Sequence, residues 1–176
     1  MSELRKANTE DPYFITTTVV GWVDMFSRSR YCEMIIDSFE YYQTRLGISF
    51  YAYVIMPSHI HMIVQSDQAK VPVFLRDFKR YTARQIIDSI VNEPGESRKN
   101  WLIPLFKQFA GNKKQNPKYQ FWQKTNYPVL LYDDKIFDQK MDYIHNNPLV
   151  AGIVTDPTKY LYSSLCPDQR LSIVEA

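Results

Sequence analysis

The chain has 176 residues, of which 45% are hydrophobic and 23% charged, as in a soluble globular protein long enough to bury a core. Its formal net charge is only +2, and its two cysteines, Cys32 and Cys166, lack metal-binding or redox spacing. No apolar run approaches the roughly 18 residues that span a membrane, and the first residues do not resemble a secretion signal. We expect a cytoplasmic protein with one domain over 1–176 and flexible tails at 1–12 and 167–176.

Basic residues are concentrated in one segment of the chain. Between residues 98 and 124 there are seven lysines and arginines and no acidic residue, so the rest of the chain has a net charge of −5. Aromatic residues are interleaved with these lysines, as in KYQFWQK at 118–124. Such a segment is ordinarily a solvated loop, but the lack of any acid favours contact with nucleic acid, whose bases can stack on aromatic rings.

The first predicted elements are a strand, a helix and a second strand. YFITTTVVGW at 13–22 is rich in β-branched and aromatic residues, which favour strands. Over residues 27–46, apolar residues recur at intervals of three and four, which predicts an amphipathic helix ended by Gly47. Residues 48–56 are apolar almost throughout, as expected of a central strand.

The stretch YAYVIMPSHIHMIVQ at 51–65 predicts an antiparallel hairpin whose second strand alternates between two faces. His59 and His61 then point to the same side, about 6–7 Å apart along the strand, close enough to share one metal ion. Ile60 points the other way, into the core, and fixes both histidines outward. Taken alone, such a pair can equally be two exposed histidines that bind no metal.

A second amphipathic helix is predicted over residues 71–91. Its inward-facing residues recur at helical spacing and are Leu75, Phe78, Thr82, Ile86 and Ile90. On the opposite side, three arginines follow one another four residues apart: Arg76, Arg80 and Arg84. This stripe is either a solvated helix face or a contact surface for DNA. Residues 92–97 (NEPGES) then predict a turn or short linker.

The last third of the chain predicts a loop, two short strands and a third helix. Residues 110–118 have loop composition, whereas 118–124 and 126–132 have strand composition. Asp133 or Asp134 can cap the helix.

This third helix would place Phe137, Met141 and Ile144 on its inner face. It would end at Asn147-Pro148, because the residue before a proline resists the α conformation. The whole order is strand, helix, strand, strand, helix, strand, which predicts an α+β fold. We expect a ferredoxin-like or RRM-like antiparallel sheet with helices packed on one face, plus an added C-terminal helix.

Two motifs resemble a known family. PSHIHMIV around the histidine pair and YIHNNPLV on the third helix, together with YFITTTVVGW, FKRYTARQI, KYQFWQ and the closing YLYSS, are similar to the REP-associated tyrosine transposases. These form a branch of the single-tyrosine HUH transposases. The resemblance covers most of the chain. It implies that Tyr143 is the nucleophile, that His59, His61 and Asn147 bind a divalent metal (Mg²⁺ or Mn²⁺), and that the tyrosine becomes linked to a 5′ phosphate of DNA.

These residue types can perform that chemistry. A tyrosine can attack a phosphodiester and conserve its energy as a phosphotyrosine. A divalent ion would polarise the phosphate, and because two imidazoles and an amide suit Mg²⁺ or Mn²⁺ only moderately, water and substrate phosphate should complete its shell. Tyr81 is a rival nucleophile, but its helix precedes the basic segment and has no asparagine four residues later, as Tyr143 has in Asn147.

We therefore predict a metal-dependent transposase that cuts and rejoins single-stranded or hairpin DNA, acting as a monomer or homodimer without membrane contact. Alternatives are a non-catalytic nucleic-acid binder on an RRM-like sheet and a metal-dependent hydrolytic nuclease without a covalent intermediate. The predicted DNA-binding residues are Arg76, Lys79, Arg80, Arg84, Lys107, Lys113, Lys114, Lys118 and Lys124.

Overall fold

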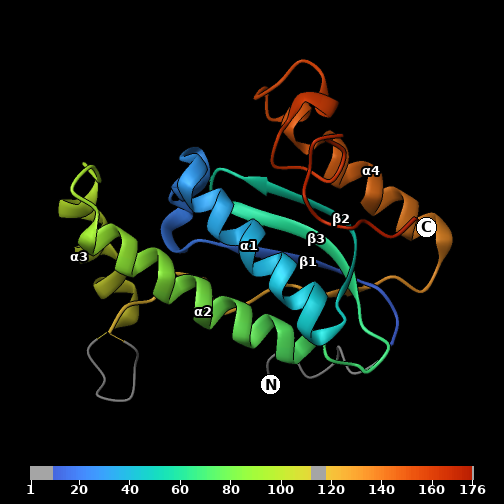
Figure 1. Ribbon diagram of the computed structural model, residues 1–176, viewed down its shortest axis with the longest axis horizontal. Coiled ribbons are helices and arrows are strands. Elements are labelled where there is room, and N and C mark those ends of the chain that lie inside the picture. Colours follow the sequence, from blue (N-terminus) through green and yellow to red (C-terminus); the bar gives the residue numbers. More distant parts are fainter. Residues whose placement is uncertain (1–9, 112–117, 176) are drawn as a thin grey trace.

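The computed structural model of the protein describes residues 10–111 and 118–175. Its elements, in chain order, are β1 (Tyr13–Thr18), η2 (Val20–Trp22), η3 (Met25–Ser27), α1 (Ser29–Leu46), β2 (Ser49–Met56), β3 (His59–Gln65), α2 (Val71–Asn92), α3 (Lys99–Ala110), β4 (Val129–Leu130), α4 (Asp134–Val150) and η4 (Pro157–Lys159). Figure 1 shows the sheet in the middle of the molecule, between helices.

The sheet has four strands in the order β2-β3-β1-β4, and every pair is antiparallel. With α1 between β1 and β2, and α2 between β3 and β4, this is the predicted ferredoxin-like arrangement. The prediction is confirmed. Residues 126–132 contain only the two-residue strand β4, and in 118–124 the ladder is reduced to a bridge between Trp122 and Val19.

The two faces of the sheet bury separate clusters. Ile60, Met62 and Val64 of β3 belong to the larger cluster, which includes the inner residues of α1 and α2. On the other face, Ile63 packs in a smaller cluster with Ile144 of α4. In Figure 1, α1 and α2 accordingly lie on one side of the sheet and α4 on the other. The added helix therefore covers the face that the core helices leave open.

Helix termini follow the expected local chemistry, with one exception. Gly47 ends α1 in the left-handed conformation (φ 62°). Asp133 caps α4 by accepting hydrogen bonds from the backbone N–H groups of the next turn. The predicted end of that helix at Asn147-Pro148 is wrong. Pro148 is buried inside α4, and the backbone N–H of Ala151 still donates to the Asn147 carbonyl at 2.9 Å, so the helix continues to Val150.

Helix α3 lies in the basic segment and was not predicted. Leu102, Phe106 and Ala110 recur four residues apart and are buried. Pro104 lies inside the helix, where it removes one backbone hydrogen bond. The residues of the predicted loop at 110–118 that lie between 112 and 117 are outside the described part of the chain.

The C-terminal segment is packed rather than free, which corrects the expectation of a flexible tail at 167–176. Leu171 is buried, and Ile173 forms a parallel bridge to Phe50 of β2. Arg170 forms three ion pairs with carboxylates along α1, those of Glu33, Asp37 and Glu40. Just before this segment, residues 162–164 pair with the outer edge of β2. An otherwise open sheet edge is thereby covered.

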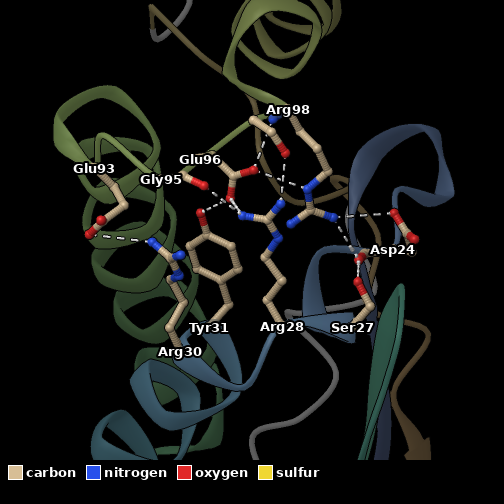
Figure 2. Close-up of polar contacts among 10 residues, drawn as sticks. Asp24, Ser27, Arg28, Arg30, Tyr31, Glu93, Gly95, Glu96 and Arg98 are labelled. Atoms are coloured by element: carbon tan, nitrogen blue, oxygen red, sulfur yellow. Dashed lines mark hydrogen bonds and ion pairs between the residues drawn. The ribbon is translucent and has the colours of Figure 1, made fainter.

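A buried carboxylate joins the start of α1 to the connection between α2 and α3 (Figure 2). Glu96 accepts a 2.6 Å hydrogen bond from the Tyr31 hydroxyl and forms ion pairs with Arg28 at 3.0 Å and Arg98 at 3.1 Å. Burial alone would raise the pKa of Glu96, but the hydrogen bonds from Tyr31 and Arg98 outweigh it and lower the pKa to about 2. Arg98 also donates to the backbone carbonyl of Asp24 at 3.2 Å. The cluster fixes the chain between η3 and α1.

Within residues 10–111 and 118–175, no helix combines the length and the apolar character needed to cross a membrane. Cys32 and Cys166 are buried free thiols.

Candidate active site

The histidine pair lies on β3, at the end next to the hairpin corner. His59 pairs with Thr18 of β1 and Met56 of β2, and His61 pairs with Thr16 and Val54. Because side chains alternate along a strand, both imidazoles lie on the α4 face, with ring centroids 4.8 Å apart. The predicted orientation of the pair is confirmed.

Both imidazoles are held through Nδ1. Nδ1 of His61 lies 2.8 Å from the Thr16 hydroxyl, and Nδ1 of His59 lies 3.1 Å from the Ser58 hydroxyl. If each Nδ1 donates its proton to the hydroxyl, each Nε2 presents a lone pair, the arrangement by which outer hydrogen bonds orient metal-ligating histidines.

Both imidazoles are also kept neutral. Burial, followed by the repulsion that a second protonated imidazole at His59 would add and by the charge of Lys140, lowers the pKa of His61 to about 3, and burial lowers the pKa of His59. Neutral imidazole is the form that binds metals.

Tyr143 reaches the pair from α4. Its side chain is half exposed, and its hydroxyl lies 3.4 Å from Nε2 of His61. Phe14 of β1 stacks on the His61 ring at 5.5 Å and meets the Tyr143 ring edge-on at 5.9 Å. Nζ of Lys140, one turn before Tyr143, lies 4.8 Å from the Phe14 ring centre and 5.8 Å from that of Tyr143. A phenol, an imidazole pair and a cation therefore meet at one exposed position.

Asn147 is one turn after Tyr143 and is partly buried on the continuing helix. Its side-chain amide forms no hydrogen bond with another described residue, so its oxygen is available. No cluster of three or more His, Cys, Asp or Glu residues suited to a metal occurs in the described ranges. Two neutral imidazoles with an amide nearby fit a divalent ion only if water or substrate phosphate supplies the remaining ligands.

The predicted arginine stripe lies away from this site. Arg76, Arg80 and Arg84 are exposed on α2, which covers the other face of the sheet. Each has a carboxylate partner: Asp77 lies 2.9 Å from Arg76 and 3.4 Å from Arg80, and Asp88 lies 3.7 Å from Arg84. The rival nucleophile Tyr81 is also on α2, in a groove beside α1. The fold therefore separates Tyr81 from the histidine pair.

A second groove brings several predicted DNA-binding residues together. It has a volume of about 520 Å³ and lies between α2, the end of α3 and residues 118–124. Five of those residues line it: Lys79, Arg80, Arg84, Lys118 and Lys124. Burial lowers the pKa of Lys79 to about 8, and its ammonium donates to the Gln123 carbonyl at 2.5 Å and the Asn126 side chain at 2.7 Å, so it also holds the groove wall together.

The other predicted DNA-binding residues fall into two groups. Lys107 lies outside the groove lining, 5.9 Å from the Tyr119 ring centre, and Lys118 approaches the same ring at 5.3 Å. Lys113 and Lys114 lie outside the described residues.

Several site residues escaped the sequence analysis, and three of them show why. Thr16 is one of three consecutive threonines, and only the pairing of β1 with β3 shows that it faces His61. Lys140 could have been found, since it precedes Tyr143 by three residues on a predicted helix. The ring of Trp22 meets that of His59 edge-on at 5.7 Å. Nothing in the sequence predicts this contact, apart from the glycine that precedes Trp22.

The comparisons with known proteins agree with the motifs. No family model matches the chain. A Haemophilus influenzae protein that carries the name REP-associated tyrosine transposase is 27% identical over 124 residues, 69% of this chain and 61% of that protein. A second, uncharacterized Haemophilus influenzae protein is 27% identical over 105 residues, 56% of this chain and 53% of that protein. The chain thus matches about three fifths or less of the length of these relatives.

A solved structure has the same fold. The structure of a REP-associated tyrosine transposase bound to a REP hairpin covers 95% of this chain, and the match spans 89% of that chain, with a TM-score of 0.62 and 16% sequence identity.

The fold and the site together define a class: a ferredoxin-like sheet that carries a histidine pair on the face covered by an added helix, with a tyrosine presented by that helix. The chain resembles the REP-associated tyrosine transposases in sequence and in fold, as its motifs predicted.

Proposed function

We propose that this protein is a transposase that cuts and rejoins single-stranded or hairpin DNA through a covalent tyrosine intermediate. The observation that carries the proposal is the Tyr143 hydroxyl, which belongs to a half-exposed side chain and lies 3.4 Å from Nε2 of His61. The named transposase relative supports the same reading.

In the proposed reaction the Tyr143 oxygen attacks the scissile phosphorus. A bond forms between phosphorus and the phenolic oxygen, and the bond to the 3′ oxygen of the preceding nucleotide breaks. The phenol loses its proton and the departing 3′ oxygen gains one. The product is a 5′-phosphotyrosine and a free 3′-hydroxyl, and attack by the 3′-hydroxyl of a second strand restores a phosphodiester. The polarity of this link is the one that the family resemblance implies.

His59, His61 and Asn147 would hold Mg²⁺ or Mn²⁺, which would polarise the scissile phosphate and offset its charge in the transition state. The chain's own residues supply the rest. Thr16 and Ser58 hold the imidazoles, and Phe14 packs against both His61 and Tyr143. Lys140 places a positive charge beside the tyrosine ring, where it favours an incoming phosphate.

The groove between α2, the end of α3 and residues 118–124, here called the basic groove, would bind the DNA backbone. Its lining carries five cationic side chains against the single carboxylate of Asp88, together with the ring of Tyr119. Electrostatic grooves with stacking rings are typical of proteins that bind single-stranded nucleic acid. We expect the substrate to be a DNA hairpin with a single-stranded extension, and the solved relative is bound to a REP hairpin.

The test uses a DNA hairpin with single-stranded tails, labelled at the 5′ end in one reaction and at the 3′ end in another, with Mn²⁺ or EDTA. We expect the 3′ label to migrate with the protein on a denaturing gel and the 5′ label to appear as a shorter free strand. Tyr143→Phe should abolish both products, whereas the matched substitution Tyr81→Phe should preserve them.

Other results would favour the alternatives. Salt-sensitive binding without any cut strand would indicate a non-catalytic binder. Cut DNA without a protein-linked band would indicate a hydrolytic nuclease, and full activity in EDTA would remove the metal from the proposal.

A further inference from the structure

Trp22 is an exposed aromatic residue held beside the histidine pair. Its side chain is 63% exposed, and its ring meets His59 edge-on with centroids 5.7 Å apart. Its backbone adopts φ 55°, in the left-handed region that bulky residues rarely occupy. Strained backbones of this kind persist only when the surrounding structure enforces them, and they cluster at ligand-binding sites.

The surroundings of Trp22 do enforce this conformation. Val19, Val20 and Val23 are buried on either side of it. The backbone N–H of Val19 donates to Ser58 at the hairpin corner, and that of Val20 donates to Phe121, both at 2.9 Å.

The preceding residue, Gly21, is also left-handed (φ 66°), and a β-carbon there would lie 3.2 Å from the Phe109 ring. A strained turn with anchored ends therefore presents one large ring to solvent.

The polar cluster of Figure 2 secures the chain that follows this turn. Arg98 donates to the Asp24 carbonyl at 3.2 Å, and the backbone N–H of Phe26 donates to Pro57 at the hairpin corner at 2.9 Å. Trp22 is thus fixed relative to both the histidine strand and the α2–α3 connection.

We propose that Trp22 is the platform on which an unpaired DNA base next to the scissile phosphate stacks. This inference rests on the proposed function, because it assumes a phosphate at the histidine pair. An exposed indole fixed in one place gives a large stacking surface at little cost in conformational entropy, and stacking on aromatic rings accepts any base.

The positions of Tyr143 and Trp22 relative to the histidines also indicate which base stacks on Trp22. Tyr143 contacts His61, His61 contacts His59, and His59 contacts Trp22, with successive ring-centroid distances of 5.1, 4.8 and 5.7 Å. Tyr143 and Trp22 therefore lie at opposite ends of this row. In a phosphoryl transfer the attacking and leaving oxygens are roughly in line. With the tyrosine attacking from one end, the leaving 3′ oxygen faces the other, so Trp22 stacks on the nucleotide immediately 5′ of the scissile bond.

Two residues of the basic groove pair with the chain just before Trp22. Trp122, in the groove lining, bridges to Val19, three residues before Trp22. The backbone N–H of its neighbour Gln123 donates to the Thr18 carbonyl at 2.8 Å, and Thr18 is paired with His59. The chain that lines the groove is therefore joined to the segment that leads to Trp22.

The experiment uses the full chain with Tyr143→Phe, which prevents cleavage, and a tailed hairpin with 2-aminopurine immediately 5′ of the mapped cleavage position. Binding should quench the probe. Trp22→Ala should remove the quenching and weaken binding about 5- to 160-fold, which is the roughly 1–3 kcal/mol of one stacked base converted at 1.36 kcal/mol per tenfold change. Trp22→Phe should retain most of both effects. Tyr41→Ala, which removes an exposed ring on α1 across the sheet, should change neither.

Two further measurements separate stacking from a general structural role. On a substrate that lacks the base at that position, Trp22→Ala should cause no additional loss of affinity, as expected when both changes remove one interaction. Trp22→Gly relieves the backbone strain, so it should bind as weakly as Trp22→Ala while its melting temperature equals or exceeds that of the parent protein.

Equal binding by the parent protein and Trp22→Ala, or quenching only of a probe on the 3′ side of the scissile bond, would overturn the inference. If the Tyr143 adduct still forms in either case, the proposed function stands. Absence of that adduct from the wild-type protein would overturn both.

Discussion

The Thr16 hydroxyl lies 2.8 Å from Nδ1 of His61 and joins the neighbouring strands β1 and β3 at the candidate active site. The bond fixes the plane of the imidazole and leaves Nε2 directed at the Tyr143 hydroxyl. His61 therefore depends on a residue that performs no chemistry itself.

Thr16→Val keeps the shape of the side chain and removes this bond. We expect Mn²⁺ affinity to fall about 10- to 100-fold, the usual effect of losing an outer partner of a metal-ligating histidine. Calorimetric titration with Mn²⁺ measures it. The matched control is Thr17→Val, because the Thr17 hydroxyl is buried without a hydrogen-bond partner among the described residues. That variant should bind Mn²⁺ normally and unfold at an equal or higher temperature. Equal affinity in the two variants would show that Thr16 does not position His61.

Metal binding should resist mild acid. The pKa of His61 is lowered to about 3, so this imidazole stays neutral as the pH falls through 6.5, and burial lowers the pKa of His59, which favours its neutral form in the same range. Mn²⁺ affinity should then change less than threefold between pH 7.5 and 6.0. Two histidines with ordinary pKa values near 6.5 would lose about tenfold over this range. A titration series at several pH values distinguishes these outcomes, and a tenfold loss would contradict the buried, neutral pair.

DNA binding should depend on salt through the basic groove. A plot of log affinity against log salt has a slope that reflects the number of phosphates contacted, about 0.7 for each contact with a single strand. Lys124→Ala should therefore reduce the slope by about 0.7 and weaken binding at low salt. Arg45→Ala removes a similar exposed charge from α1, outside the groove, and should leave the slope unchanged. Parallel slopes for the wild type and Lys124→Ala would place the DNA elsewhere.

The buried Glu96 should make the fold sensitive to acid. Its pKa falls from an ordinary 4.5 to about 2 in the folded protein, so its stabilising effect is present above about pH 4.5 and is lost as the pH falls toward 2. Glu96→Gln should be destabilised near neutral pH by up to roughly 3 kcal/mol, since it leaves two arginines without their carboxylate. Urea unfolding at pH 6, 4.5 and 3 should show the difference between the two proteins shrinking with acid. A difference that stays constant would contradict the lowered pKa.

Much of this architecture could be predicted because it follows from local patterns. The alternation around Ile60 sets the orientation of the histidines, and helical spacing identifies α1, α2 and α4. Gly47 and Asp133 mark helix ends by their conformational and hydrogen-bonding preferences. Local patterns also failed in two places. Residues 99–110 were not predicted to be a helix, although Leu102, Phe106 and Ala110 recur at helical spacing, and Pro148 suggested an end to α4 that the packed helix does not have.

Other features depend on contacts between distant parts of the chain. Arg170 binds α1 carboxylates more than 130 residues earlier in the chain, and Ile173 pairs with Phe50, so a polar tail becomes part of the fold. The Thr16–His61 bond and the position of Trp22 arise in the same way, from strand pairing and an anchored turn. Such relationships have no periodic signature in the sequence.

The most direct test of the central claim is to locate the covalent bond by mass spectrometry. The wild-type protein is incubated with a tailed hairpin and Mn²⁺, treated with nuclease and digested with trypsin. Tyr143 is the only tyrosine in the expected peptide, residues 141–159, whereas Tyr81 begins a separate peptide after Arg80. We predict a nucleotide remnant on the 141–159 peptide, attached to Tyr143. A remnant on the peptide that contains Tyr81, or DNA cleavage with no modified peptide, would contradict the proposed mechanism.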